Sequence, residues 1–230
     1  MGTVTIQKYT TKKPLKMIGY EAGICYNTTN KKYKERALNC IKSMHGRTLE
    51  FPDVYMVIDG YSARVIREFY THIGGLPTRL QESTRYIDYS KGFEYIIPKT
   101  IESNQWAKQQ YVDLMKHINS TMDNIMKTLD IDKKKLKEDL ANCLPLGMKT
   151  KIVVKINLRN LIEMSHQRMC FRAYWEFREL FNDIAKALSN YSPEWKEIVD
   201  TVFMPKCQYL NRCPEENSCG YFDNLKKNMI

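Results

Sequence analysis

Residues 157–189 read NLRNLIEMSHQRMCFRAYWEFRELFNDIAKALS and carry the clearest helical pattern in the chain. Their apolar side chains recur every three or four residues, or after seven where one position is skipped: Leu158, Ile162, Met169, Ala173, Phe177, Leu180, Ile184 and Leu188. This spacing places the apolar side chains on one face of a helix, as expected for a face that packs against a core. We therefore predict a long C-terminal helix over residues 157–189.

Shorter patterns predict the remaining elements. Residues 3–9, 52–60 and 149–155 read as strands, and the second of these is apolar enough to be buried on both faces. Helical spacing predicts helices at residues 32–43, 62–73, 103–129 and 132–142, with Gly74-Gly75 stopping the second. Residues 76–90 have no helical period and are predicted to form a long, sharply folded loop. Because helices and strands alternate irregularly and no Gly-rich dinucleotide or Walker sequence occurs, we predict an α+β, mixed helix-and-sheet domain.

Size and charge narrow the class of protein. A chain of 230 residues with 43% hydrophobic residues fits one domain over residues 1–230, with a cysteine-containing tail at 206–230. Neither a signal peptide nor an apolar run long enough for a membrane span is recognisable, so we expect a cytoplasmic protein that does not enter membranes. The net charge of +10 attracts anionic partners, but basic and acidic residues are interspersed. Phosphorylated small molecules explain this charge as well as nucleic acid does.

The cysteines do not form a recognisable framework. Three of the seven lie in the tail, at Cys207, Cys213 and Cys219, with five residues between successive cysteines. This spacing is wider than in common zinc knuckles, and no histidine lies nearby. We therefore expect a packed tail with free thiols and no metal site, with metal binding as the alternative.

Two polar segments are candidates for a binding site. Residues 78–86 are dense in hydroxyl, amide and guanidinium groups, and an extended backbone would point Ser83 and Arg85 to the same side, where both reach one phosphate. In the predicted long helix, Asn157, Arg168 and Arg172 share a face that borders the apolar stripe. From composition alone, a solvated loop and surface arginines remain the alternatives.

Five blocks, in order, resemble the flavin-dependent thymidylate synthase (ThyX) family. They begin with Ala22-Gly23-Ile24-Cys25-Tyr26 and His45-Gly46-Arg47-Thr48-Leu49-Glu50, and continue with Gln81-Glu82-Ser83-Thr84-Arg85-Tyr86. Leu144-Pro145 before Thr150 follows, and then Asn157-x-Arg159 leads to Arg168 and to Ala173-Tyr174-Trp175-Glu176-Phe177-Arg178. The tail is also similar to tails of some family members.

The resemblance implies an enzyme with a defined chemistry. Reduced FAD, regenerated by NADPH, mediates transfer of a one-carbon unit from methylenetetrahydrofolate to C5 of dUMP in a homotetramer with sites between subunits. By position, Arg168 is the catalytic residue that stabilises the charge developing on the pyrimidine. The implied nucleotide contacts are Glu68, Thr71, Gln81, Glu82, Ser83, Thr84 and Arg85. The implied flavin contacts are Arg47, His72, Ile73, Thr78, Arg79, Asn157, Arg159, Glu163 and Arg172.

Departures from the family pattern concentrate on the nucleotide pocket. The family's Arg-His-Arg-x-x-Ser signature falls on Thr71-His72-Ile73, and Thr78 follows after the two extra residues Gly74-Gly75, so only the histidine is kept. Glu68 and Gln81 stand where the family has Gln and Glu. These changes keep UMP or a modified pyrimidine nucleotide as an alternative substrate, and hydroxymethyl as an alternative product. A non-catalytic, basic nucleic-acid-binding protein is the alternative from another class.

Overall fold

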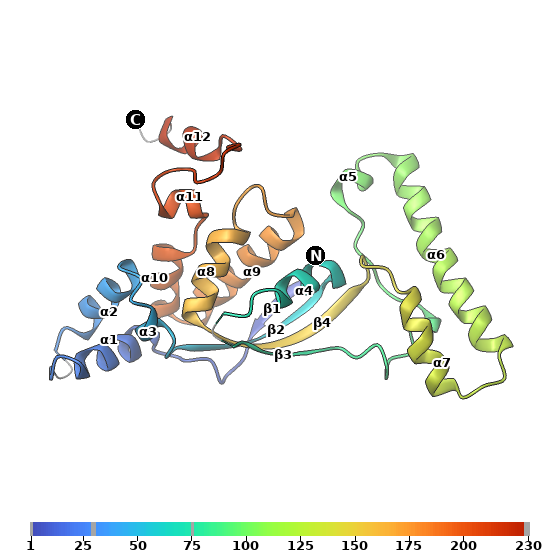
Figure 1. The fold of residues 1–230 in the computed structure, drawn as a ribbon, viewed down its shortest axis with the longest axis horizontal. Helices are drawn as coiled ribbons and strands as arrows, with labels where there is room; N and C mark the ends of the chain where they lie inside the picture. The colour runs from blue at the N-terminus through green and yellow to red at the C-terminus, as the bar shows by residue number, and fades with distance from the viewer. Residues whose placement is uncertain (1, 29–30, 75, 228–230) are drawn as a thin grey trace. The chain divides into compact units, whose positions relative to one another are not determined.

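The computed structural model describes residues 2–28, 31–74 and 76–227 (Figure 1). Helices predominate, and four strands form one antiparallel sheet in the order β1-β2-β4-β3. The strands are β1 (Thr3–Ile6), β2 (Asp53–Ser62), β3 (Thr78–Gln81) and β4 (Lys149–Asn157). The predicted α+β class is confirmed. Gly75, part of the predicted Gly74-Gly75 stop, lies outside the described residues.

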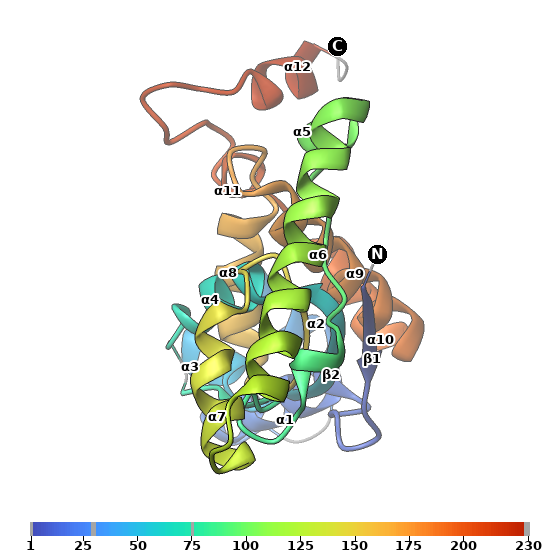
Figure 2. The same cartoon turned by 90° about the vertical axis from the view of Figure 1, so that its right-hand side faces the viewer.

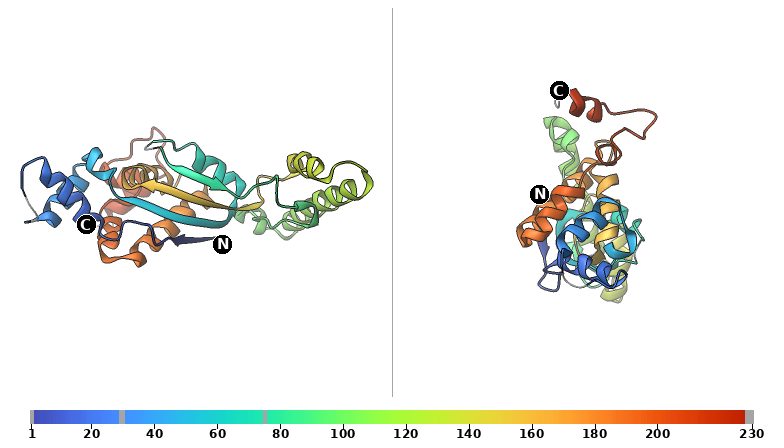
Figure 3. Two further views of the ribbon diagram at one scale, coloured as in Figure 1. Left: turned by 90° about the horizontal axis from the view of Figure 1, so that it is seen from below. Right: turned by 90° about the vertical axis from the view of Figure 1, so that its left-hand side faces the viewer.

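One face of the sheet supplies the core. In β2, Val54, Met56 and Ile58 are fully buried, whereas Tyr55 and Val57 remain partly exposed. The same alternation recurs in β4. Helices α8 and α9 lie on one side of the strands, as the side view and the view from below show (Figures 1 and 3). The prediction that residues 52–60 are buried on both faces was therefore wrong, because the packed helices cover only one.

The chain folds into two compact units, each described by itself. Unit 1 comprises residues 59–70 and 80–152, and unit 2 comprises residues 2–58, 71–79 and those from 153 onward. The prediction of a single domain over residues 1–230 stays a prediction.

Unit 2 holds most of the helices. In chain order they are α1 (Pro14–Ile24), α2 (Tyr33–Lys42), α3 (Gly46–Leu49), α8 (Leu158–Arg168), α9 (Trp175–Tyr191), α10 (Pro193–Val202), α11 (Lys206–Tyr209) and α12 (Tyr221–Lys227).

Two side chains of α10 fix the start of α1. The carboxylate of Glu194 accepts hydrogen bonds from the backbone N–H of Leu15 at 2.8 Å and of Lys16 at 3.2 Å. The fully buried Trp195 donates its indole N–H to the carbonyl oxygen of Thr11 at 2.7 Å. An acidic side chain at a helix N-terminus satisfies N–H groups that the helix leaves open.

Unit 1 is built around a helical hairpin. Helices α6 (Gln105–Thr128) and α7 (Lys133–Leu140) run side by side (Figure 2). Met122, Leu136 and Leu140 form a small buried cluster between them. The other helices of this unit are α4 (Ala63–Tyr70), α5 (Lys99–Glu102) and the 3-10 turns η1 (Tyr89–Lys91) and η2 (Ala141–Cys143).

The predicted long C-terminal helix is two helices. Helix α8 ends at Arg168, and α9 begins at Trp175 after an irregular connection over residues 169–174. The backbone turns there, with Ala173 N–H donating to the carbonyl oxygen of Cys170 at 2.9 Å. No glycine or proline marks the break, because contacts with the tail hold this connection: Phe171 stacks on Tyr221 with ring centroids 4.5 Å apart.

Further elements differ from the sequence-based expectations, and helices α3, α5, α10, α11 and α12 lie where no helix was predicted. Residues 78–81 of the predicted loop form β3, since they pair with the edge of the sheet. Helix α1 was not predicted, although Pro14 at its first position is a typical helix start. In the described part of the chain, no helix combines the length and apolar character needed to cross a bilayer.

A close approach of α1 and α2 yields a stability prediction. A Cβ atom added at Gly19 would lie 2.0 Å from the carbonyl oxygen of Tyr33. Backbone atoms cannot give way as a flexible side chain can, so Gly19→Ala should lower the free energy of unfolding by about 2 kcal/mol or more in urea titrations. At Gly74 the nearest atoms would be 3.7 Å away. Gly74→Ala is therefore the control, expected to leave stability unchanged; equal stability of both variants would contradict the close packing of α1 on α2.

Candidate active site

Helix α8 positions the polar residues of unit 2. Asn157 caps this helix, and its Oδ1 accepts the backbone N–H of Asn160 at 2.9 Å. An asparagine cap satisfies an N–H group at the first turn and fixes where the helix begins. Asn157, a predicted flavin contact, therefore uses its side-chain oxygen to cap the helix.

A chain of ion pairs surrounds the first turn of α8. Glu50 accepts from Arg159 at 2.7 Å and from Arg47 at 3.2 Å, and Arg159 also donates to Glu163 at 3.1 Å. The hydrogen bond from Arg159 is the main cause that lowers the pKa of the Glu50 carboxyl, with burial acting in the opposite direction. The structure thus brings together three of the predicted flavin contacts. Arg47 and Arg159 share Glu50, a residue that was not predicted, and Glu163 pairs with Arg159.

Gly46, the first residue of α3, lies close to the side chain of Arg159. A Cβ atom at Gly46 would lie 2.9 Å from the guanidinium of Arg159, so a larger residue would require the guanidinium to shift. Glycine therefore lets the start of α3 approach the arginine closely.

A second buried amide lies near the Gly74 turn. Asn160 is 4% exposed, and its Nδ2 has no hydrogen-bond partner among the described residues. An added Cβ at Gly74 would lie 3.8 Å from this Nδ2 and 3.7 Å from Oε2 of Glu163. A buried donor without a partner is costly unless a ligand or water satisfies it. Asn160 was missed from sequence, although it lies between the two predicted flavin contacts Asn157 and Arg159 on one side and Glu163 on the other.

Arg168 is held on two sides. Its Nε–H donates to Nε2 of His72 at 2.9 Å, and its guanidinium lies 4.6 Å from the centroid of the Phe177 ring. The guanidinium of Arg79 donates to the backbone carbonyl of the same histidine. His72 also meets the edge of Phe177, with centroids 6.1 Å apart. The predicted catalytic arginine and two predicted flavin contacts are therefore neighbours, although 96 residues separate His72 from Arg168.

The environment keeps His72 uncharged. Burial, followed by the charges of Arg168 and Arg79, lowers its pKa from 6.5 to about 4. Since Nε2 accepts the hydrogen bond from Arg168, the single ring proton of the neutral imidazole lies on Nδ1. A neutral acceptor beside the guanidinium fixes its orientation without cancelling its charge.

The predicted phosphate loop lies in unit 1. Gln81 donates to Thr150 Oγ1 at 3.3 Å, and the backbone N–H of Glu82 donates to the carbonyl of Lys151 at 2.8 Å. Beyond them the chain turns, and Ile87 N–H donates to the carbonyl of Ser83 at 3.3 Å. The expectation of an extended backbone was wrong here, because this turn replaces strand pairing after Glu82.

The polar side chains of this turn form hydrogen bonds within the protein. Ser83 Oγ accepts the backbone N–H of Arg85 at 3.2 Å, and Arg85 forms two bonds of 3.0 Å to Glu138. Thr84 is half-buried, and the Arg85 side chain is 61% exposed. The pair with Glu138 is thus accessible to solvent and can be exchanged for another anion at little cost.

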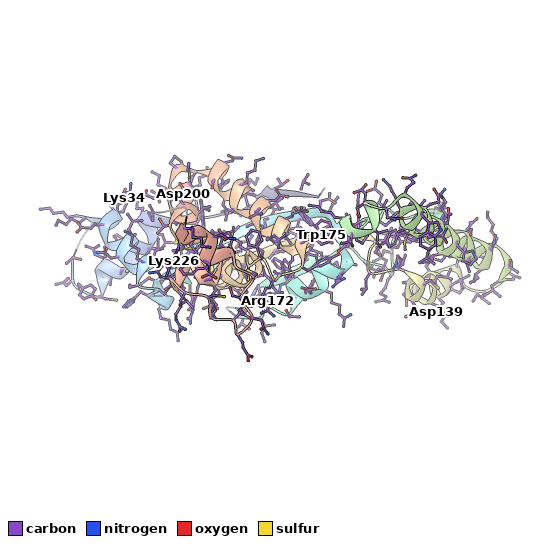
Figure 4. The ribbon with its side chains drawn as sticks, turned by 90° about the horizontal axis from the view of Figure 1, so that it is seen from above. Lys34, Asp139, Arg172, Trp175, Asp200 and Lys226 are labelled. Atoms are coloured by element: carbon purple, nitrogen blue, oxygen red, sulfur yellow. The ribbon has the colours of Figure 1, made fainter. Side chains whose placement is uncertain are left out.

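The other predicted contacts are scattered. Glu68 on α4 lies 3.8 Å from Arg64. Thr71 and Thr78 are exposed, and Ile73 is 73% exposed. Arg172 lies outside both helices, in the 169–174 connection, where it donates to the carbonyl of Asn217 at 2.8 Å and pairs with Glu215 at 3.4 Å (Figure 4). Its predicted place on a helix face with Arg168 was wrong, since α8 ends before it.

A cavity of about 390 Å³ adjoins Arg168 between the end of α8 and the tail. Its lining includes Arg168, Arg172, Lys206 and four cysteines, Cys170, Cys207, Cys213 and Cys219. Burial, and then the nearby Cys170 and Cys213, raise the pKa of the Cys207 thiol.

Comparison with known proteins gives a consistent result. The family model described as thymidylate synthase complementing protein (Thy1) matches residues 6–194. The chain belongs to this family of flavin-dependent thymidylate synthases. A flavin-dependent thymidylate synthase of Nitratidesulfovibrio vulgaris is 29% identical over 190 residues, covering 79% of this chain and 74% of that protein. Another, from Clostridium tetani, is 26% identical over 239 residues, covering 94% and 93%.

Solved structures agree on the fold. ThyX from Helicobacter pylori, determined with FAD and dUMP, has a TM-score of 0.62 at 17% identity and covers 86% of this chain and 99% of its own. A second structure of that protein, also complexed with FAD and dUMP, has the same TM-score at 19% identity. The resemblance to the ThyX family is thus confirmed, and membership in a family of flavin enzymes argues against the nucleic-acid-binding alternative.

The half-buried, neutral His72 predicts a pH dependence of stability. Between about pH 4 and 6.5 the unfolded chain binds a proton at this residue that the folded chain does not. The free energy of unfolding should therefore fall as pH drops through this window. In His72→Gln, urea titrations at several pH values should give a shallower decline. His166, whose pKa burial also lowers, is present in both proteins and cancels in the comparison. Parallel pH profiles would contradict the neutral state of His72.

Proposed function

We propose that this ThyX-family chain transfers a one-carbon unit to C5 of dUMP, with FAD as cofactor, methylenetetrahydrofolate as carbon donor and NADPH as reductant. The observation that carries the proposal is the fixed guanidinium of Arg168, next to His72 and Phe177. Family membership and the FAD and dUMP bound to the Helicobacter pylori relative support it.

Arg168 is the proposed catalytic residue. Its guanidinium stays charged at every relevant pH and suits the flat carbonyl–nitrogen edge of a pyrimidine. Negative charge that develops on the ring during attack through C5 is stabilised by a cation already in place. His72 acts through Arg168 as a positioning residue, because its Nε2 fixes rotation of the guanidinium, and Phe177 supports the guanidinium face.

The residues around the first turn of α8 fit a flavin. Among the described residues, the buried Nδ2 of Asn160 has no hydrogen-bond partner, and the Gly74 backbone leaves room beside it. Asn160 and Arg159, with Arg47, Thr78 and Arg79, are the proposed FAD contacts of this chain. FAD, when bound and reduced, supplies the electrons that convert the transferred carbon to a methyl group.

The loop at residues 81–85 is the proposed phosphate-binding segment, since its residues match the family's nucleotide block. Arg85 is held by Glu138 in an exposed pair, which a dianionic phosphate can replace. The altered positions Glu68 and Gln81 favour a pocket different from that of other family members, so UMP is the second candidate substrate. The proposed working form is a cytoplasmic homotetramer whose sites form between subunits, in keeping with the family resemblance and with the free cysteines of the described chain.

Tritium release from 5-tritiated nucleotides tests the reaction. The purified protein should be yellow and release tritium from dUMP, and Arg168→Ala should lower turnover by about two to three orders of magnitude while flavin absorbance is unchanged. Lys196→Ala, which removes an exposed cation paired with Asp200, is the control and should retain full activity. Release from UMP alone would replace dUMP as substrate, and near-normal turnover of Arg168→Ala would contradict the role of this arginine.

Nucleotide affinity tests the phosphate loop. Ser83→Ala and Arg85→Ala should each weaken dUMP binding by ~1–3 kcal/mol, because each removes a hydrogen bond to a charged group. Isothermal titration of the FAD-loaded protein measures this effect. Lys127→Ala, which breaks an exposed pair with Asp123 in the same unit, should bind dUMP normally. If both loop variants bind as tightly as the unmodified protein, the phosphate lies elsewhere.

A further inference from the structure

The cavity beside Arg168 is lined mostly by the tail. Eight of its fourteen lining residues lie between positions 206 and 222, and the others belong to the end of α8 and to the connection at residues 169–174. All of them belong to unit 2. The match to the family model ends at residue 194, so most of this wall lies outside the matched region. The volume of about 390 Å³ falls within the range of small-molecule pockets, about 300–1,000 Å³.

The charged side chains of the cavity leave a positive balance. Its lining has three cations, Arg168, Arg172 and Lys206, and one carboxylate, Glu215, which together leave two positive charges. His166 also lines the cavity, and burial is the main cause that lowers its pKa, so this ring is uncharged at neutral pH. Such a cavity attracts a ligand that carries two negative charges.

The cavity also has an apolar wall. Burial is the main cause that raises the pKa of the Cys207 thiol, which therefore stays protonated at neutral pH. Among the described side chains, no three His, Cys, Asp or Glu groups are placed to hold a metal ion. A protonated thiol behaves as a small, polarisable apolar group. Together with the buried ring of Phe222, Cys207 thus offers a surface suited to a flat, apolar part of a ligand.

We propose that this cavity binds the p-aminobenzoyl-glutamate end of the folate co-substrate. The inference rests on the proposed function, in which the carbon donor has to meet the pyrimidine beside Arg168. In methylenetetrahydrofolate the transferred carbon lies between the pterin and the p-aminobenzoyl nitrogen, so the p-aminobenzoyl-glutamate end begins at the reacting carbon. Its two carboxylates match the two positive charges of the cavity, and its benzoyl ring matches the wall formed by Cys207 and Phe222.

Arg172 and Lys206 are the contacts for the carboxylates in this proposal. Arg172 donates to the carbonyl oxygen of Asn217 at 2.8 Å, which orients the guanidinium, and pairs with Glu215 at 3.4 Å. Both members of this ion pair are about half exposed, and an exposed pair contributes little to stability. A substrate carboxylate can therefore replace Glu215 and accept paired N–H groups from the guanidinium. Lys206 is exposed at the start of α11 and supplies the second cation.

A phosphate, such as the 2′-phosphate of NADPH, is the other dianion to consider. Phosphates are commonly bound by backbone N–H groups at helix N-termini. Helix α8 instead reaches the cavity with its C-terminal end, where the partial charge of a helix is negative. Arg172 and Lys206 lie on separate segments, which suits two carboxylates on one chain better than a single phosphate group.

Steady-state kinetics of the FAD-loaded, full-length protein test this subsite. Lys206→Ala should raise the KM for methylenetetrahydrofolate about tenfold, the loss of one charge-assisted hydrogen bond, with kcat and the KM for dUMP unchanged. Lys206→Arg should restore a low KM. Glu215→Gln should lower this KM, because it removes the negative charge beside Arg172. Lys227→Ala is the matched control, since this exposed cation of the tail does not line the cavity.

A shortened carbon donor tests which part of the folate is bound. Methylenetetrahydropteroate lacks the glutamate, so the unmodified protein should use it with a KM raised at least about tenfold. In Lys206→Ala the two donors should differ less, because the partner of the glutamate has already been removed. The same difference between the two donors in both proteins would overturn the contact between Lys206 and the glutamate.

Saturation-transfer NMR with p-aminobenzoyl-glutamate gives a readout that needs no turnover. The unmodified protein should contact this fragment, with a weaker signal for Lys206→Ala and for p-aminobenzoate, and adenosine 2′,5′-bisphosphate should not displace it. Displacement by adenosine 2′,5′-bisphosphate, or equal fragment binding by Lys206→Ala, would overturn the proposal. Fragment binding by a protein without methylase activity would contradict the proposed function alone, whereas full activity without fragment binding would contradict the subsite alone.

Discussion

The proposed role of Arg168 depends on its hydrogen bond to His72. An arginine side chain has several rotatable bonds, and holding it in one orientation costs conformational entropy. Here the neutral imidazole takes the Nε–H at 2.9 Å, and the Phe177 ring lies 4.6 Å from the guanidinium. The guanidinium is therefore in place before a nucleotide arrives. Because His72 stays uncharged, it does not neutralise the positive charge of Arg168, which in the proposed reaction stabilises a pyrimidine that gains electron density.

Contacts at both ends of α8 fix the position of Arg168 and so support its hydrogen bond to His72. The Asn157 cap fixes the start of α8, and Glu50 fixes Arg159 on its first turn, so the helix carries Arg168 to a defined place at its other end. The turn after Arg168 is held by the tail, through the stack of Phe171 on Tyr221 and the hydrogen bond from Arg172 to the carbonyl oxygen of Asn217. The tail thus links to Arg168, the proposed catalytic residue, through the connection between α8 and α9.

Local patterns in the sequence predicted three of the four described strands, the helices α2, α4, α6 and α7, the segment of α8 and α9 as one helix, and the α+β class, because periodicity reports which side of an element is buried. The break between α8 and α9 could not be predicted, since no glycine or proline marks it and its cause is the tail, some fifty residues away. The resemblance to the ThyX family pointed to Arg168 and His72 separately, but their contact across 96 residues required the fold. Asn160 was missed because only the fold shows that its amide is buried without a partner among the described residues. In the same way, only the fold shows that Cys170 lines one cavity with the cysteines of the tail.

The most direct test of the central interaction is the nitrogen-15 NMR spectrum of the His72 ring, with the signal assigned by comparison with His72→Gln. We predict a neutral ring at pH 7 with its proton on Nδ1 and an unprotonated Nε2, unchanged until the pH approaches the low value to which burial shifts this group. A proton on Nε2, or an imidazolium with an ordinary pKa near 6.5, would mean that His72 does not accept the hydrogen bond of Arg168. The proposed positioning of Arg168 would then be wrong.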